Sequence, residues 1–228
     1  MRMAGRRGFE RARELVRQRI QIAAAAWSYC DELVANELQM LSSRGTAASC
    51  GRGCSHCCRE EIRVAKAEAE AAKQYIDDTW DAASVETLKH RLRAWLKWYT
   101  THYPRMVEAG ASRHEALYEY GPQCAVLRVD TQECGIYPAR PLTCRRHYVS
   151  SPPDACRQLA DAHYLNRKQE PLASVVTASE PARKQLEERT AAAGAEYFQT
   201  AHLLVEWLAH LYRVEIEPWR RTPPLFER

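Results

Sequence analysis

Cysteine is the residue type whose number and spacing in this sequence point most directly to chemistry. Nine of the 228 residues are cysteines, and eight of them fall into two groups, at residues 50–58 and 124–156. The eight grouped positions are Cys50, Cys54, Cys57, Cys58, Cys124, Cys134, Cys144 and Cys156. Deprotonated cysteine binds metals, and closely spaced cysteines are typical of zinc sites and iron–sulfur clusters. The grouping therefore predicts that these eight residues bind a metal.

The spacers of the first group suit a loop that wraps around a metal. Two or three residues separate its first three cysteines, and Gly51 and Gly53 let the backbone turn sharply. Neighbouring side chains usually diverge, so the adjacent pair Cys57–Cys58 suits two metals, or two irons of one cluster, better than two corners of one zinc site. Eight thiolates would complete two zinc sites, or one four-iron cluster with sulfurs left over. Both interpretations stay open at this point.

Other uses of the cysteines fit the sequence less well. The eight grouped cysteines are an even number, which is compatible with disulfides. However, we see no secretory signal and expect a cytoplasmic protein with reduced thiols. A thioredoxin-like dithiol at Cys54 and Cys57 would need a surrounding βαβ pattern, which is missing. His56 and His147 are possible substitute ligands, although each is more often a plain loop histidine. Cys30 lies on the apolar face of an expected helix and is assigned to the core.

Arginines flank the cysteines in the sequence. Eight thiolates carry more negative charge than two zinc ions neutralise, and guanidinium groups could offset that charge and donate hydrogen bonds to sulfur. The arginines in question are Arg52, Arg59, Arg63, Arg140, Arg145 and Arg146. The alternative is that these side chains are merely exposed.

The net charge of +4 arises at the N-terminus, because residues 1–20 contain seven arginines and two glutamates. We interpret this stretch as a solvated helix start, with contact to RNA, an acidic partner or a membrane surface as the alternative. No apolar run approaches the roughly 18 residues of a transmembrane helix. No RNA-recognition, KH or zinc-finger pattern is present. We therefore expect metal ions as partners, no membrane span and no nucleic-acid binding, and the sequence indicates no particular protein partner.

The hydrophobic pattern predicts a mostly α protein in which long helices frame a loop-rich, cysteine-rich metal site with at most short strands. We expect a single domain over residues 1–228, with a metal-binding core at about 50–156. Flanking helices are expected at about 9–42 and 179–213, and two central ones at 65–80 and from a cap at Ser84 to Pro104. Prolines exclude a long helix in 121–157, where short strands are expected at 125–129 and 135–137. The tail from 218 onward is expected to be extended.

The motif Cys50-x3-Cys54-x2-Cys57-Cys58, followed by Cys124 and then by Cys134-Gly-Ile-Tyr137-Pro-Ala-Arg140-Pro-Leu-Thr-Cys144-Arg145, resembles the CxxCxxCC family. This family, also called the cysteine cluster family, is described as a zinc- or iron-chelating domain. The resemblance spans about residues 50–156 and implies chelation by the seven cysteines of the motif. The family name implies two residues between the first two cysteines, where this chain has three.

Within the second half of this motif, Tyr137, Arg140 and Arg145 are the candidate cofactor-contacting residues. Pro138 and Pro141 fix the backbone of the turn between Cys134 and Cys144 and so bring these two closer. Tyr137 could pack over the site, and a guanidinium could bind a sulfur or a carbonyl.

Three functions remain in view. The first is chelation of zinc or iron, including iron in an iron–sulfur cluster, and it is favoured because many ligands are present without a recognisable catalytic base. The second is an iron–sulfur-dependent redox or group-transfer enzyme, since flagellin lysine methylases are similar in carrying cysteine-cluster motifs. The third is an interaction module stabilised by zinc.

Overall fold

The structure is a computed structural model that describes all residues except 1, 52, 158–170, 195–199 and 216–228, and also leaves out the side chains of 2–8, 114, 154 and 157. The described chain is mostly α, so the predicted fold class is confirmed. The principal helices are α1 (Arg2–Ser43), α2 (Lys66–Thr79), α3 (Ala82–Thr101), α4 (Tyr103–Glu108), α6 (Leu142–Arg145), α7 (Pro153–Arg157), α8 (Ala173–Ala178), α9 (Glu180–Ala192) and α11 (Leu204–Leu211). Shorter helical turns are η1 (His56–Arg59), α5 (Arg113–Glu115), η2 (Ala116–Tyr120) and η3 (Tyr137–Ala139).

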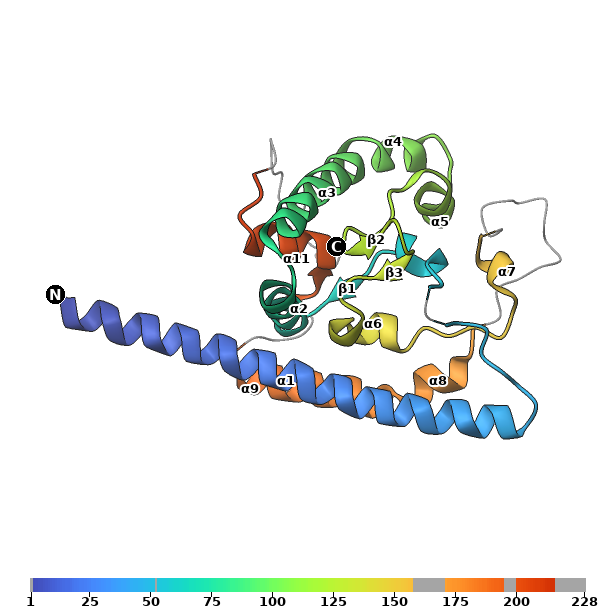
Figure 1. Cartoon of the computed structure of the whole chain (residues 1–228), viewed down its shortest axis with the longest axis horizontal. Helices are drawn as coiled ribbons and strands as arrows, with labels where there is room; N and C mark the ends of the chain where they lie inside the picture. The colour runs from blue at the N-terminus through green and yellow to red at the C-terminus, as the bar shows by residue number, and fades with distance from the viewer. Residues whose placement is uncertain (1, 52, 158–170, 195–199, 216–228) are drawn as a thin grey trace.

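Helix α1 runs along one side of the molecule, with α8 and α9 beside it and α2 packed against it (Figure 1). Its buried face is built from small and aromatic residues, namely Ala23, Ala26, Trp27, Cys30 and Val34. Their spacing of three or four residues is the helical period, so one stripe faces the neighbouring helices. Cys30 is fully buried on this stripe, as predicted. The same cluster of buried side chains includes residues of α2, α3, α6, α9 and α11.

In the described residues the strands are two residues long and form two antiparallel pairs. Strand β1 (Arg63–Val64) pairs with β4 (His202–Leu203), and β2 (Leu127–Arg128) pairs with β3 (Glu133–Cys134). Strand β2 lies inside the predicted range 125–129. Strand β3 lies just before the predicted range 135–137, because the hairpin turns at Gln132, whose positive φ of 55° sets Leu127 opposite Cys134. From Tyr137 onward the chain forms η3 instead.

The predicted continuous helix at 179–213 is wrong. Helix α9 ends at Ala192, and Gly194 follows with a φ of +70°. This left-handed conformation favours glycine and commonly follows a helix end. The chain then forms β4 before α11 begins at Leu204.

Two finer predictions also change. Asp81, not Ser84, caps α3, since its carboxylate accepts a hydrogen bond from the backbone N–H of Ser84 at 2.7 Å. Pro104 stands in the first turn of α4, where its missing N–H costs no helical hydrogen bond. The tail from 218 lies outside the described residues.

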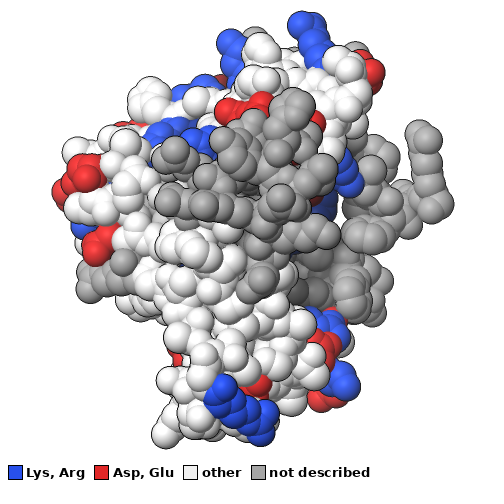
Figure 2. Space-filling model, turned by 90° about the vertical axis from the view of Figure 1, so that its right-hand side faces the viewer, with Lys and Arg blue, Asp and Glu red and all other residues white. Residues whose placement is uncertain are grey.

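Charged side chains of both signs are distributed around the described part of the face in Figure 2, and the surface between them is mainly uncharged. None of the helices searched among the described residues has the length and hydropathy of a membrane span.

A buried ion pair ties α1 to α2. The Nε and Nη2 atoms of Arg19 each lie 2.7 Å from a carboxylate oxygen of Glu70. The two side chains are only 9% and 5% exposed. Removing one partner of such a pair leaves the other charge buried and uncompensated, which is more destabilising than replacing both.

We predict that Arg19→Met lowers the free energy of unfolding by about 3–5 kcal/mol, whereas the double variant Arg19→Met with Glu70→Met loses clearly less. Denaturant titration followed by circular dichroism measures both. Arg17→Met is the matched control, because Arg17 pairs with Glu14 at 2.8 Å on the exposed face of the same helix. A loss for Arg19→Met no larger than for this control would contradict the role given to the buried pair.

Candidate metal centre

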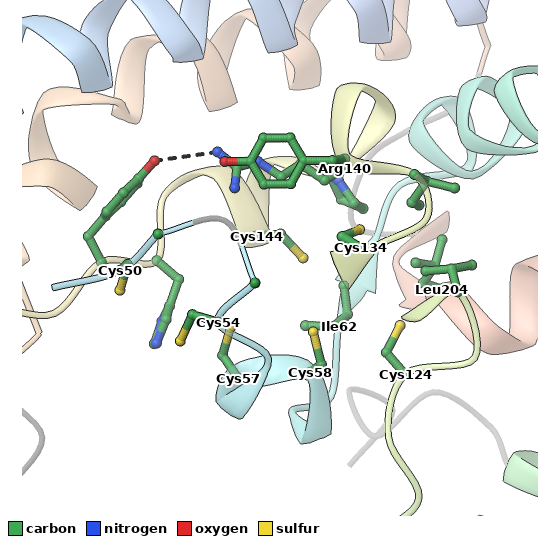
Figure 3. A pocket seen from close by; sticks show the side chains of 18 residues that line it. Cys50, Cys54, Cys57, Cys58, Ile62, Cys124, Cys134, Arg140, Cys144 and Leu204 are labelled. Carbon is green, nitrogen blue, oxygen red and sulfur yellow. Dashed lines mark hydrogen bonds between the residues drawn. The ribbon is translucent and has the colours of Figure 1, made fainter. Parts of the chain in front are cut away.

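The two cysteine groups meet at one cavity of about 130 Å³. Seven of the eight grouped cysteines line it, namely Cys50, Cys54, Cys57, Cys58, Cys124, Cys134 and Cys144. Figure 3 shows their side chains arranged around a common space, with the first group on one side and α6 and β3 on the other. Residues far apart in the sequence are therefore neighbours here.

A tight loop and a single helical turn present the first group. Gly53 adopts a φ of +88°, which favours glycine, and the N–H of Cys54 donates to the carbonyl of Gly51 at 3.1 Å. The turn η1 then carries Cys57 and Cys58. The N–H of Cys124 donates to the carbonyl of Cys58 at 2.6 Å, so the backbone joins the two groups directly.

The β2–β3 hairpin presents Cys134. Its neighbour Gly135 packs against Trp80, and a Cβ at this position would lie 2.6 Å from the Trp80 ring and 2.8 Å from the carbonyl oxygen of Val126. Only glycine fits such a close approach. Arg91 of α3 braces the other side of the hairpin, because its guanidinium donates to the carbonyls of Cys124 and Leu127.

The carboxylate of Glu68 positions α6, which carries Cys144. One oxygen accepts hydrogen bonds from the N–H of Leu142 at 2.8 Å and from the indole N–H of Trp27 at 3.1 Å. The other accepts from the N–H of Ala65 at 3.1 Å. Glu68 is 1% exposed, and burial raises its pKa, although the N–H of Leu142 favours the charged form.

Burial also controls the pKa values of the thiols. It raises the pKa of Cys124 to about 11 and raises the pKa values of Cys134 and Cys144. A hydrogen bond between the adjacent thiols lowers the pKa of Cys57 and raises that of Cys58. Without metal, the thiols of Cys124, Cys134 and Cys144 therefore keep their protons at neutral pH, and a metal that binds them must displace those protons.

The donor set suits zinc or iron, because both metals bind thiolate sulfur. The cavity is also many times larger than the roughly 10–15 Å³ that one water requires. However, across the described ranges no group of three or more His, Cys, Asp or Glu side chains stands close enough to hold a metal ion. The sulfurs would have to move inward on binding. The assignment of the seven cysteines as ligands therefore stays a prediction.

Cys156 does not line the cavity. It is 5% exposed on α7, which packs against η1. Cys50 does line the cavity, and its sulfur accepts a hydrogen bond from the N–H of Val149 at 3.3 Å. All nine cysteines are described, and none forms a disulfide.

Tyr137 and Arg140 line the cavity together. The Arg140 guanidinium lies over the Tyr137 ring, 4.2 Å from its centroid, and its Nη2 is 3.4 Å from the Tyr148 hydroxyl. Its Nε is buried and has no hydrogen-bond partner among the described residues. This N–H is available to a sulfur that moves inward.

Arg145 points away from the cavity. Its Nε donates to the carbonyl of Arg140 at 2.7 Å, and its two other nitrogens contact the carbonyl of Pro138 and the carboxylate of Asp31. The guanidinium also lies over the Trp27 ring, 5.2 Å from its centroid. Arg145 therefore joins the segment before α6 to α1. The sequence pattern predicts a contact between Arg145 and the cofactor, but the structure does not bring this side chain to the sulfurs.

The remaining arginines have other contacts, and Arg52 lies outside the described residues. Arg59 donates to the carbonyl of Gly121, Arg63 lies 3.7 Å from the Glu61 carboxylate, and Arg146 lies 2.7 Å from that of Glu180. His147 lines the cavity, but His56 does not.

The sequence reasoning did not identify the apolar wall of the cavity, formed by Ile62, Val126, Ile136, Pro141 and Leu204. It also missed Glu68 and Arg91. Only the unusual placement of Glu68 among the alanines of an amphipathic helix could have drawn attention to it.

We predict that Glu68→Ala lowers the free energy of unfolding by about 1–3 kcal/mol or more, because it removes both oxygens and leaves three buried N–H donors without an acceptor. Hydrogen exchange should show faster exchange of the Leu142 amide in the variant. Glu86→Ala, at a 62% exposed side chain on α3, is the control and should leave both quantities nearly unchanged. An unaltered Leu142 exchange rate in Glu68→Ala would show that Glu68 does not hold α6.

Comparison with known proteins supplies one match. No curated protein and no solved structure matches the chain. The CxxCxxCC family model, described as "Putative zinc- or iron-chelating domain", matches residues 49–169. This match covers more than half of the chain and includes all eight grouped cysteines, so the protein belongs to the CxxCxxCC family.

Proposed function

We propose that the protein binds zinc or iron through the thiolates of the cysteine cavity. The observation that carries this proposal is the meeting of seven cysteines from two distant segments around one space. The ligands in this proposal are those seven residues, with Cys156 on α7 as an eighth donor. The description of the family points to the same two metals.

Charge favours a bound cation at this place. Several buried thiols in one cavity lose their protons only if a positive charge compensates them, and a metal ion supplies that charge. Arg140 adds a fixed positive charge at the cavity wall, which favours the thiolate forms of Cys57, Cys134 and Cys144 and opposes the effect of burial on them. We include Arg140 and Tyr137 in the site because both line the cavity, and we leave Arg145 outside it because it does not.

The proposal also includes a single domain and a reducing, cytoplasmic setting. The buried cluster shared by helices from both ends of the described chain supports the first. The cysteines support the second, because none of the nine forms a disulfide and such a cluster would oxidise in a compartment that forms disulfides.

Metal analysis tests the proposal directly. Protein purified without air should contain at least about one zinc or iron per chain by elemental analysis. Visible absorption separates the two metals, because an iron–sulfur cluster is coloured and zinc is not. A variant with Cys57, Cys58, Cys134 and Cys144 replaced by alanine should contain almost none. Protein with no metal, even after addition of zinc or of iron and sulfide, would overturn the proposal.

A second prediction concerns Arg140. Arg140→Ala should weaken metal binding by about 10- to 100-fold, the usual effect of losing a group that contacts the ligands. Competition with a chromophoric chelator measures the change. Arg128→Ala is the control, because Arg128 is exposed on the nearby strand β2 and does not line the cavity. Equal affinities in the two variants would remove Arg140 from the site.

A further inference from the structure

Helix α1 begins before the body of the protein, by which we mean the part of the fold that covers α1 from Arg19 onward. Its N-terminal part extends beyond α9 and the body (Figure 1). We call residues 9–18 the arm, because they are the described side chains that precede the first buried one, that of Arg19. Residues 9–14 are exposed, with Phe9 at 60%, and in the arm only Leu15 and Val16 are half-buried. The arm is therefore a stretch of helix that is largely open to solvent.

The arm has an apolar side. Its apolar residues are Phe9, Ala12, Leu15 and Val16, and the other six residues are polar or charged. Spacings of three and four residues place these apolar side chains on one stripe of the helix. Such a stripe is typical of a helix that packs against a neighbour.

The apolar side of the arm continues the side of α1 that the body covers. Positions alternately three and four residues apart form one seam along the helix, namely Phe9, Ala12, Val16, Arg19, Ala23, Ala26 and Cys30. The last four of these are buried, and Arg19 pairs there with Glu70 of α2. This alternation is the one that keeps a helix facing a second helix along its length. The seam therefore extends past the helices of the body that cover it.

The same end of the chain carries its excess positive charge. Residues 1–18 contain six arginines and two glutamates, whereas the rest of the chain contains 27 basic and 27 acidic residues. In the arm Arg11, Arg13 and Arg17 are exposed, and the Arg13 guanidinium lies over the Phe9 ring, 4.7 Å from its centroid. Arg13 thus stands directly beside the seam. Basic side chains in this position favour a partner with acidic side chains beside its own apolar seam.

The shape of the molecule selects among anionic partners. Because α2 packs on the same side of α1 further along, a flat lipid surface that lay against the seam would meet the body. A nucleic acid offers phosphates to the arginines but no row of apolar side chains to the seam. A second copy of this chain has no net charge outside residues 1–18, and two basic arms repel each other. A helix, by contrast, is narrow enough to lie beside the arm and presents apolar and acidic side chains together.

We infer that the arm is a docking site for an acidic amphipathic helix of another protein. The apolar residues of the partner pack on Phe9, Ala12 and Val16, and its carboxylates pair with Arg13 and the other exposed arginines of the arm. The two helices together continue the packing that the body provides from Arg19 onward. The arm does not line the cysteine cavity, so this contact requires no bound metal.

A designed peptide tests the inference on the full chain. The probe is a fluorescent helix of about three heptads with leucine in its seam and glutamate beside the seam, and the matched peptide has lysine in place of glutamate. Anisotropy titration at low salt should show binding of the acidic peptide and at least about tenfold weaker binding of the lysine peptide. Added salt should weaken the binding of the acidic peptide, because the charges are exposed.

Protein variants locate the contact. Phe9→Asp with Ala12→Asp should weaken binding of the acidic peptide by about 10- to 100-fold, because it removes an apolar anchor and adds negative charge to the seam. Both residues are exposed, so the variant should keep its fold, which circular dichroism checks. Val129→Asp with Ala83→Asp is the matched control, since it makes the same change in charge at two exposed apolar residues outside α1. The control should bind the peptide as tightly as the wild type does.

Several results would overturn the inference. Failure of the wild type to bind the acidic peptide at low salt removes the docking site, and equal affinity for both peptides removes the role of charge. Equal affinity of the arm variant and its control places the peptide elsewhere. Wild-type dimers in analytical ultracentrifugation that the arm variant dissociates make a second copy the occupant. Binding to phosphatidylserine vesicles or to single-stranded RNA that the arm variant abolishes, without binding of the peptide, assigns the arm to lipid or to nucleic acid instead.

Discussion

The buried carboxylate of Glu68 is the interaction on which the arrangement of the cavity depends. It accepts hydrogen bonds from Trp27 on α1, from Ala65 at the start of α2 and from Leu142 at the start of α6. A buried carboxylate is costly unless its oxygens are paired, so all three donors must remain in place together. The relative positions of α1, α2 and the turn that carries Cys144 are thereby fixed by one side chain.

The rest of the loop-rich segment is held in the same manner. Arg145 binds two carbonyls of residues 138–140 and a carboxylate of α1, while Arg91 binds the carbonyl of Cys124 and that of Leu127 in β2. Residues 121–157 contain little helix or strand, so their backbone groups need partners from side chains. Charged side chains provide these partners from outside the cavity. The sulfurs are therefore left facing inward, where a metal is the partner that suits them.

The helical framework could be read from the sequence because apolar residues recur with the helical period along α1, α2 and α3. The grouping of the cysteines also predicted a metal-binding core at about 50–156, and both groups line one cavity in this range. The role of Arg145 could not be read from the sequence. Successive residues of a helix point about 100° apart, so Cys144 and Arg145 face different ways. The end of helix α9 before Gly194 could not be recognised in the sequence, because alanines precede this glycine and apolar residues resume after it. Two-residue strands such as β1 and β4 are too short to show alternation.

The pairing of β4 with β1 has a consequence for how the protein is made. Leu204, directly after β4, forms part of the wall beside sulfurs that belong to residues 50–58. At about 5–20 residues per second, a ribosome needs roughly 7–30 s to synthesise the chain between them. During that interval the first four thiols have left the exit tunnel and their enclosure is unfinished. The cavity is thus closed only after residue 204 has been synthesised, and until then the four thiols of residues 50–58 lack this part of their wall.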